Sequence, residues 1–180
     1  AGAEWIYLEG YRFDGPESHA AFAKAIAAAK GAGGRVSLTL SDPFCVDRHR
    51  DAFRRMIRED LDMLFANRAE VMSMYGGSFA EAMQAAAAEV PVAVITESEK
   101  GAHVWAEGQH WHVPAVPTRI VDATGAGDLF AGAFLWAVAE GHGWEACARM
   151  GCLAASEVIS HLGARPEADL RGLFAANGLL

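Results

Sequence analysis

Residues 122–128 read Asp-Ala-Thr-Gly-Ala-Gly-Asp, so small residues lie between two carboxylates. An apolar run that is typical of a helix follows at once over 129–136. Small residues let backbone N–H groups turn toward a common point, and a helix that begins there directs its unpaired N–H groups and its positive dipole end at the same point. The segment therefore predicts an anion site suited to phosphate. Asp128, in the first helical turn, could then take a proton from a hydroxyl that attacks a phosphoryl group.

The segment is open to two other interpretations. Glycine-rich turns commonly precede helices, and Asp is favourable in a first helical turn, so an ordinary structural turn is one alternative. The dinucleotide site of a Rossmann-type oxidoreductase is the other, and it requires G-x-G-x-x-G after an early strand. The Gly125–Gly127 run comes late in the chain and lacks the third glycine in register, which argues against that site.

The complete D-A-T-G-A-G-D string resembles the C-terminal signature of the ribokinase-like (phosphofructokinase B, PfkB) family of carbohydrate and nucleoside kinases. The resemblance implies that Asp128 is the general base on the acceptor hydroxyl. It also implies that the backbone amides of Gly125, Ala126 and Gly127 form the anion hole for the transferred phosphoryl group. ATP and Mg²⁺ are the implied cofactors.

A second motif, Asn67-Arg68-Ala69-Glu70, follows a run that predicts a strand at 61–66. By itself it indicates a helix start, because Asn is a good N-cap and Glu three residues later completes a capping-box pattern. In the ribokinase-like family, an N-x-x-E motif at the corresponding place organises Mg²⁺, its waters and the nucleotide phosphates. The resemblance therefore implies that Asn67 and Glu70 bind the nucleotide, with Glu70 acting on Mg²⁺ through its water ligands.

The segment 96–102 resembles the family's T-x-G-x-x-G loop, which lies near the ATP ribose and phosphates. Thr96 and Gly101 match this loop and are the implied nucleotide contacts. Ser98 replaces the first glycine, which leaves the backbone conformation of the loop open. Lys100 is either a phosphate contact or an ordinary solvated lysine.

Further positions are implied by the same resemblance. The segment 42–48 resembles the family's D-P-N-x-R loop only loosely, because Phe44 stands where Asn is usual. Residues 151–166 resemble the helix and the Gly-Ala turn that wall the adenine pocket, and Cys152 stands where many members have Asn. Many members also bind a monovalent cation such as K⁺ beside the anion hole. Its implied ligands are Asp122, Thr124 and backbone carbonyls near Ser160 and Gly163.

Strands alternate with helices along the chain, which predicts an α/β fold with a mostly parallel sheet and helices on both faces. This is the three-layer α/β/α, Rossmann-like arrangement of the ribokinase-like family. In such sheets ligands bind beyond the carboxyl ends of the strands. The expected strands are 4–8, 35–40, 61–66 and 91–96, with a hairpin of 104–106 and 110–113; the expected helices are 17–31, 47–59, one opened by Asn67, 78–88, 127–140, 143–160 and 167–175.

The resemblance extends from about residue 4 to 175 and corresponds to the C-terminal part of a family member. Residues 1–180 are therefore expected to form a single ATP-binding and catalytic portion that lacks the N-terminal strands and the β-lid over the substrate. A strand at 4–8 would then expose an apolar edge. Either the sequence is a fragment or a partner chain completes the site.

Composition excludes several other classes of protein. Of the 180 residues 52% are hydrophobic, and 15 Lys and Arg against 23 Asp and Glu give a net charge of −8, which argues against a nucleic-acid partner. No stretch is long enough to span a membrane and no signal peptide is visible, which favours the cytoplasm. The three cysteines form no C-x-x-C pair and the seven histidines show no metal spacing, so we expect reduced core thiols. His110 and His112 are expected on the hairpin surface.

The function that these motifs favour is transfer of the ATP γ-phosphate to a hydroxymethyl group of a small sugar or nucleoside. Segments 7–11, 37–42 and 157–164 most resemble the adenosine-kinase-like bacterial branch, which favours adenosine over ribose or fructose. The part of the family fold that reads the acceptor is absent, so the acceptor stays open. The intact protein is expected to be able to form a homodimer.

A non-catalytic nucleotide-binding fragment or interaction module that lacks the acceptor site is the alternative function. The intact Asp128, Asn67 and Glu70 argue against it, whereas the missing N-terminal part argues that this chain alone is inactive.

Overall fold

The computed structural model describes residues 3–180 and divides them into two compact units. The first unit contains the residues up to Thr96 together with Trp105–Gln109. The second contains Glu97–Val104 and His110–Leu180. Each unit is described by itself.

The first unit is built on four parallel strands, and apolar residues of neighbouring strands share the same rows. Leu8 pairs with Leu38, Leu38 with Leu64, and Leu64 with Ala93, which forms one apolar row across the strands. The strands are β1 (Trp5–Glu9), β2 (Arg35–Thr39), β3 (Met63–Asn67) and β4 (Val92–Thr96), and the full strand order is β1-β2-β3-β4-β5-β6.

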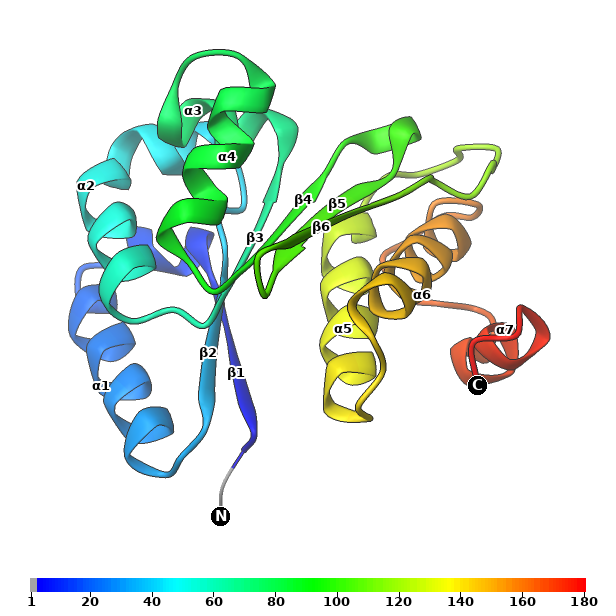
Figure 1. The fold of residues 1–180 in the computed structure, drawn as a ribbon, viewed down its shortest axis with the longest axis horizontal. Coiled ribbons are helices and arrows are strands. Elements are labelled where there is room, and N and C mark those ends of the chain that lie inside the picture. Colours follow the sequence, from blue (N-terminus) through cyan, green and yellow to red (C-terminus); the bar gives the residue numbers. More distant parts are fainter. Residues whose placement is uncertain (1–2) are drawn as a thin grey trace. The chain divides into compact units, whose positions relative to one another are not determined.

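The helices of the first unit lie together beside these strands in Figure 1. Their apolar faces share one core with the residues of β2, β3 and β4 that point to the same side. A 3₁₀ turn, η1 (Gly10–Asp14), follows β1. The helices are α1 (Ser18–Gly31), α2 (Pro43–Glu59), α3 (Arg68–Tyr75) and α4 (Phe79–Glu89).

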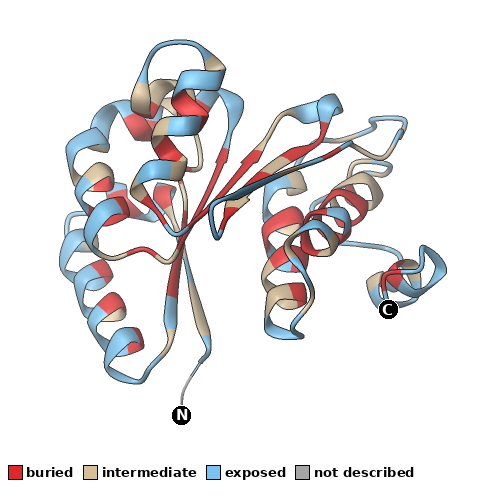
Figure 2. Cartoon of the chain, in the orientation of Figure 1, coloured by how far each residue is buried: buried red, intermediate tan, exposed pale blue. Residues whose placement is uncertain are grey.

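Four of the five residues in each of β3 and β4 are buried, and both strands are mostly red in Figure 2. In β3, Leu64 and Ala66 belong to the core under the helices, while Met63 and Phe65 alternate with them and are also buried. A continuous apolar run is the pattern of a parallel strand that is covered on both sides. The edge strand β1 is different, since none of its residues is fully buried and Tyr7 is 37% exposed.

Helix α2 begins at Pro43, so the expected start at residue 47 is wrong. The Asp42 side chain caps the helix by accepting the Cys45 N–H (2.6 Å), and Pro43 occupies the first turn, where its missing N–H removes no helical bond. The backbone leaves helical geometry at His49 (φ −123°, ψ 17°). The charged pattern that predicted the helix begins only at residue 47, whereas the helix itself starts one turn earlier, before this kink.

A helical pair and most residues of a hairpin belong to the second unit, while the hairpin residues Trp105–Gln109 belong to the first. A two-residue turn at Glu107 and Gly108, both with positive φ (54° and 73°), joins the hairpin strands. Phe130 and Phe134 on α5 and Met150 on α6 are buried. The elements are η2 (Ser98–Lys100), β5 (Ala102–Ala106), β6 (Gln109–Val113), α5 (Ala126–Ala139), α6 (Trp144–Val158) and α7 (Leu170–Ala176).

The expected fold class is confirmed, because strands and helices alternate as the sequence predicts and the first four strands are parallel. Between residues 3 and 180, no helix combines the length and the apolar character needed to cross a membrane.

Phe53 and Phe44 lie on the same helix and give a matched test of the first unit's core. Phe53 is 0% exposed, whereas Phe44 is 74% exposed. Phe53→Ala leaves a cavity and is expected to lower the free energy of unfolding by about 3–5 kcal/mol. Phe44→Ala should change it by less than about 0.5 kcal/mol. Urea denaturation of both variants measures the difference, and equal losses would contradict this core.

Candidate active site

The loop before α5 depends on a glycine that no other residue could replace without strain. Gly125 forms the N-cap of α5 in the left-handed conformation (φ 81°, ψ 0°). A Cβ at this position would lie 2.8 Å from the Ala164 Cβ, so the turn also packs against the segment that follows α6. The sequence DATGAGD therefore has a local structural reason for its first glycine.

The first amides of α5 are available to a ligand, with one exception. The Ala126 N–H donates to the Ala123 carbonyl at 3.3 Å. Within residues 3–180, the amides of Gly125, Gly127 and Asp128 donate to no acceptor. Unpaired amides at the positive end of a 14-residue helix favour an anion. Of the three amides expected in the anion hole, those of Gly125 and Gly127 are therefore free and that of Ala126 is engaged.

Asp128 occupies the first turn of α5, as expected, and is exposed. No residue of the described chain forms a hydrogen bond or an ion pair with its carboxylate. The carboxylate thus lies beside the free amides and can accept a proton from a hydroxyl group that approaches the same point.

Asp122 uses both carboxylate oxygens to hold the loop together. Its Oδ1 accepts the Thr124 N–H (2.9 Å), and its Oδ2 accepts the Gly163 N–H (3.0 Å). Hydrogen bonds from the Thr124 side chain, the Gly163 amide and the Thr124 amide lower the pKa of Asp122 to about 2. The ionised carboxylate joins the entry of α5 to the segment after α6.

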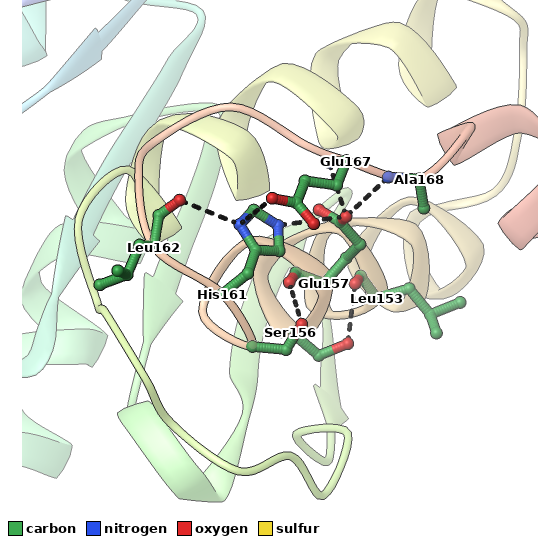
Figure 3. A network of polar contacts seen from close by, with 8 residues as sticks. Leu153, Ser156, Glu157, His161, Leu162, Glu167 and Ala168 are labelled. Carbon is green, nitrogen blue, oxygen red and sulfur yellow. Dashed lines mark hydrogen bonds and ion pairs between the residues drawn. The ribbon is translucent and has the colours of Figure 1, made fainter.

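Glu157, near the end of α6, binds the segment that follows this helix (Figure 3). Its Oε1 accepts the N–H groups of Glu167 and Ala168, both at 2.8 Å, and lies 3.3 Å from His161 Nε2. These contacts fold the segment 161–168 back onto the end of α6. Gly163, which binds Asp122, lies within this segment.

The residues expected around a monovalent cation are partly brought together. Asp122, Thr124 and Gly163 are in contact, whereas the Ser160 hydroxyl donates to the Glu157 carbonyl at 2.7 Å. An ionised carboxylate together with backbone and hydroxyl oxygens is a donor set that suits a hard cation. The chemistry of the residues present is therefore compatible with K⁺.

A cavity of about 300 Å³ opens beside α6, and Cys152 is one of the residues that line it. Burial raises the pKa of the Cys152 thiol to about 11, so the thiol is neutral at physiological pH. Leu153 adds an apolar wall, and Arg149 and Asn177 add polar groups. The remaining lining residues are His112, Val113, Pro114, Ala115, Val116, Pro117 and Glu145.

In the first unit, Asn67 and Glu70 form the expected helix start. The Asn67 side chain accepts the Glu70 N–H (2.9 Å), and Glu70 Oε2 accepts the Asn67 N–H (2.9 Å). Thr96 lies beside Asn67 in the register of β3 and β4, so the three residues share the carboxyl ends of adjacent strands. The expected grouping of Asn67, Glu70 and Thr96 is therefore present.

Glu70 is only 4% exposed, and its pKa is raised to about 7. Burial is the main cause, hydrogen bonding from the Asn67 backbone opposes it, and the negative charge of Asp42 adds to it. A cation near these two carboxylates would relieve both effects, and Mg²⁺ prefers oxygen ligands. The donor set fits a Mg²⁺ ion held through carboxylates and water.

Sequence reasoning missed Tyr11 as a member of this group. A hydrogen bond to Asp42, followed by burial, raises the pKa of Tyr11 to about 12. Its backbone N–H donates to the Ser41 hydroxyl at 3.2 Å. No motif signalled this contact, because Tyr11 follows β1 and Asp42 follows β2.

The loop 96–101 has Ser98 where the family motif has its first glycine, and the structure shows the backbone conformation at that position. Ser98 adopts φ 48°, which is the left-handed conformation that a glycine would take without strain. Gly101 has φ 101°, and a Cβ there would lie 1.9 Å from the Val113 carbonyl oxygen. Lys100 forms an ion pair with Glu97 at 2.9 Å. The loop keeps the glycine-like geometry, and its lysine is paired within the loop.

Residues 1–170 match the profile of a protein family described as pfkB family carbohydrate kinase. A probable sugar kinase from Rhizobium etli is 40% identical, with a TM-score of 0.96 over 99% of this chain and 55% of that protein. The adenosine kinase from Sinorhizobium meliloti is 36% identical, with a TM-score of 0.93 over 97% of this chain and 54% of that protein.

A cytidine kinase from Thermococcus kodakarensis is 35% identical over 124 residues, which cover 64% of this chain and 43% of the relative. The chain thus spans about half the length of the proteins it matches.

The buried carboxyl of Glu70 predicts a distinctive pH dependence. Its unfolded-state pKa lies near 4.5 and its folded-state pKa near 7, so the unfolded chain releases the proton first. The free energy of unfolding therefore falls as the pH rises from 4.5 to 7, by about 1.4 kcal/mol for each unit of pKa difference. Glu70→Gln keeps the capping acceptor without the charge and should remove this decline.

Glu81 is the matched control, because it occupies the same capping-box position at the exposed start of α4. Hydrogen bonds from Ser78 lower its pKa, so Glu81→Gln should instead remove a stabilisation that is present above the unfolded pKa. Urea denaturation at several pH values distinguishes the two variants. A Glu70→Gln profile parallel to wild type between pH 4.5 and 7 would contradict the buried carboxyl.

The strained Ser98 backbone gives a second test. Ser98→Gly should raise the free energy of unfolding by about 0.5–1 kcal/mol, because relief of the left-handed conformation exceeds the entropy cost of a glycine. Glu99→Gly, in the same turn without a positive φ, should lower it by about 0.5–1 kcal/mol. Thermal and urea unfolding measure both. Equal destabilisation by the two variants would count against the loop geometry.

Proposed function

The chain belongs to the pfkB family of carbohydrate kinases, and from this premise we propose that it carries the nucleotide-binding and phosphoryl-transfer groups of an ATP-dependent sugar or nucleoside kinase. The observation that carries the proposal is the start of α5. There, free amides of Gly125 and Gly127 adjoin the unpaired, exposed carboxylate of Asp128.

In the proposed reaction, Asp128 accepts the proton of an acceptor hydroxymethyl group. The acceptor oxygen then forms a bond to the γ-phosphorus of ATP as the bond to the bridging oxygen breaks, and ADP leaves with that electron pair. The Gly125 and Gly127 amides stabilise the charge on the transferred group. Ala126 can join them when its N–H releases the long 3.3 Å bond to Ala123.

Nucleotide-contacting groups are proposed in each unit, taken by itself. Asn67 and Glu70 hold the waters of Mg²⁺, which neutralises phosphate charge when bound. Thr96 and the Gly101 loop contact the ribose and phosphates, and the cavity beside Cys152 takes the base. Asp122, Thr124 and the carbonyls near Ser160 and Gly163 hold a monovalent cation, whose charge would add to that of the amides.

The acceptor is proposed to be a nucleoside, with adenosine as the first choice. Two of the relatives are an adenosine kinase at 36% identity and a cytidine kinase at 35% identity. The most similar structure named above is a probable sugar kinase, so ribose and fructose belong in any assay.

Asp128→Asn tests the proposed base. In the full-length protein with Mg-ATP, this variant should lower kcat for the preferred acceptor by at least about 100-fold while the Kd for ATP stays unchanged, because proton transfer is lost and the amides remain. Glu140→Gln, at the other end of α5, is the control and should retain activity. ADP release with adenosine, cytidine, ribose and fructose measures the rate, and calorimetry measures ATP binding.

Near-normal turnover by Asp128→Asn would overturn the assignment of the base. If the wild-type protein binds Mg-ATP but transfers phosphate to none of the acceptors, the non-catalytic nucleotide-binding module becomes the better description.

A further inference from the structure

Three metal-ligating side chains of different chemistry meet where η1 approaches the first turns of α2. They are Asp14, Cys45 and His49, and one ligand atom from each lies within 4.8 Å of the other two. Asp14 ends η1, while Cys45 and His49 are four residues apart on α2 and so lie on the same helix face. None of them has a part in the proposed phosphoryl transfer.

His49 and Asp14 are hydrogen-bonded to each other. The His49 Nε2 atom lies 2.5 Å from Asp14 Oδ1, so this hydrogen bond occupies the position that a metal ion would take between the same two atoms. The Cys45 sulfur completes a set of one thiol, one imidazole and one carboxylate. Asp14 is exposed and His49 is partly exposed, which leaves the group open to an ion from solvent.

The surrounding residues hold these groups in place. Phe13 packs edge-on against the His49 ring, with 5.2 Å between ring centroids, and stacks on His19 at 4.0 Å. The Arg48 guanidinium donates to both oxygens of Asp14, at 3.1 Å to Oδ1 and 2.6 Å to Oδ2. Each carboxylate oxygen has a second lone pair, so Arg48 can orient Asp14 while Oδ1 binds a metal ion.

The non-helical backbone at His49 contributes to the same arrangement. Helix α2 loses regular geometry at this residue alone among its described positions, with φ −123° and ψ 17°. The kink lies where the imidazole meets Asp14.

We propose that Asp14, Cys45 and His49 form a binding site for a divalent transition metal ion of the zinc type. Thiolate and imidazole ligands select such an ion over Mg²⁺, which prefers oxygen alone. On binding, the thiol of Cys45 loses its proton to water, and the neutral imidazole of His49 binds the metal through a ring nitrogen in place of its hydrogen bond to Asp14. A water molecule takes the fourth position of a tetrahedral site.

Because the Cys45 thiol must lose its proton, the affinity of the site for the metal depends on pH. Burial, followed by the negative charge of Asp14, raises the pKa of the Cys45 thiol to about 11, so the thiol is protonated in the metal-free protein. The metal must displace that proton, and its affinity therefore increases with pH. Arg48 opposes the rise through its positive charge and favours the thiolate.

The spacing of these residues along the chain did not reveal the site. Asp14 lies far from the other two in sequence, and neither the cysteines nor the histidines form a zinc pattern. The hairpin offers a rival pair, because His103 Nδ1 and His110 Nε2 lie 3.1 Å apart. That pair contains no sulfur, which makes the two locations distinguishable by spectroscopy.

Titration of the chelator-treated, full-length protein with Co²⁺, followed by Zn²⁺, tests the proposal. We expect one Co²⁺ to bind with the near-ultraviolet absorption of a thiolate–cobalt bond, and Zn²⁺ to displace it. Cys45→Ala should abolish that absorption. His49→Gln removes a direct ligand, so it should weaken Co²⁺ binding by more than about 100-fold, the upper end of the loss caused by removing a residue that only supports a ligand. Cys147→Ala, a buried cysteine of α6, is the control and should leave the spectrum unchanged.

Asp14→Asn keeps the buried thiol in place and guards against a folding defect in Cys45→Ala. It should weaken Co²⁺ binding while far-ultraviolet circular dichroism stays that of the wild type. Absence of Co²⁺ binding, a spectrum without thiolate absorption, or binding that survives Cys45→Ala but is lost in His103→Ala would each overturn the proposal.

Discussion

The Asp122 carboxylate is the interaction on which the candidate anion site depends. It joins backbone amides of Thr124 and Gly163, and the latter lies 41 residues away along the chain. This bond brings the Gly125 turn against Ala164, and Glu157 holds the segment 161–168 from its other side. Because backbone amides bind an anion well only when their direction is fixed, these two hydrogen-bonded carboxylates support the candidate anion site without contacting the ligand.

The surroundings of Asp122 and Glu70 shift the pKa values of these two carboxyl groups in opposite directions. Asp122 accepts hydrogen bonds from Thr124 and Gly163, which keep its carboxylate ionised. Glu70 is buried beside another carboxylate, which favours its protonated form unless a cation is present. The charge of Asp122 is stabilised by groups of the protein itself, whereas the charged form of Glu70 would be stabilised by a bound cation.

The fold and much of the site could be predicted from local sequence, for physical reasons. Period and composition indicate buried parallel strands such as β4, and a capping box such as Asn67 to Glu70 is specified by residues three apart. Helix α2 begins earlier than its charged pattern indicates, because Asp42 caps a first turn that carries none of that pattern. Tyr11 beside Asp42, and Asp14 beside His49, depend on contacts between distant segments, which periodicity does not encode.

The measurement that most directly tests the central claim is amide chemical-shift mapping of this 19.1 kDa chain by NMR as Mg-ATP is added. The account predicts that the Gly125 and Gly127 amide protons move downfield, as unpaired donors do when they bind a phosphate oxygen, while the Leu129 amide, already bonded to Gly125, changes least. Unchanged Gly125 and Gly127 resonances at saturating Mg-ATP would contradict the claim that the start of α5 binds the transferred phosphate.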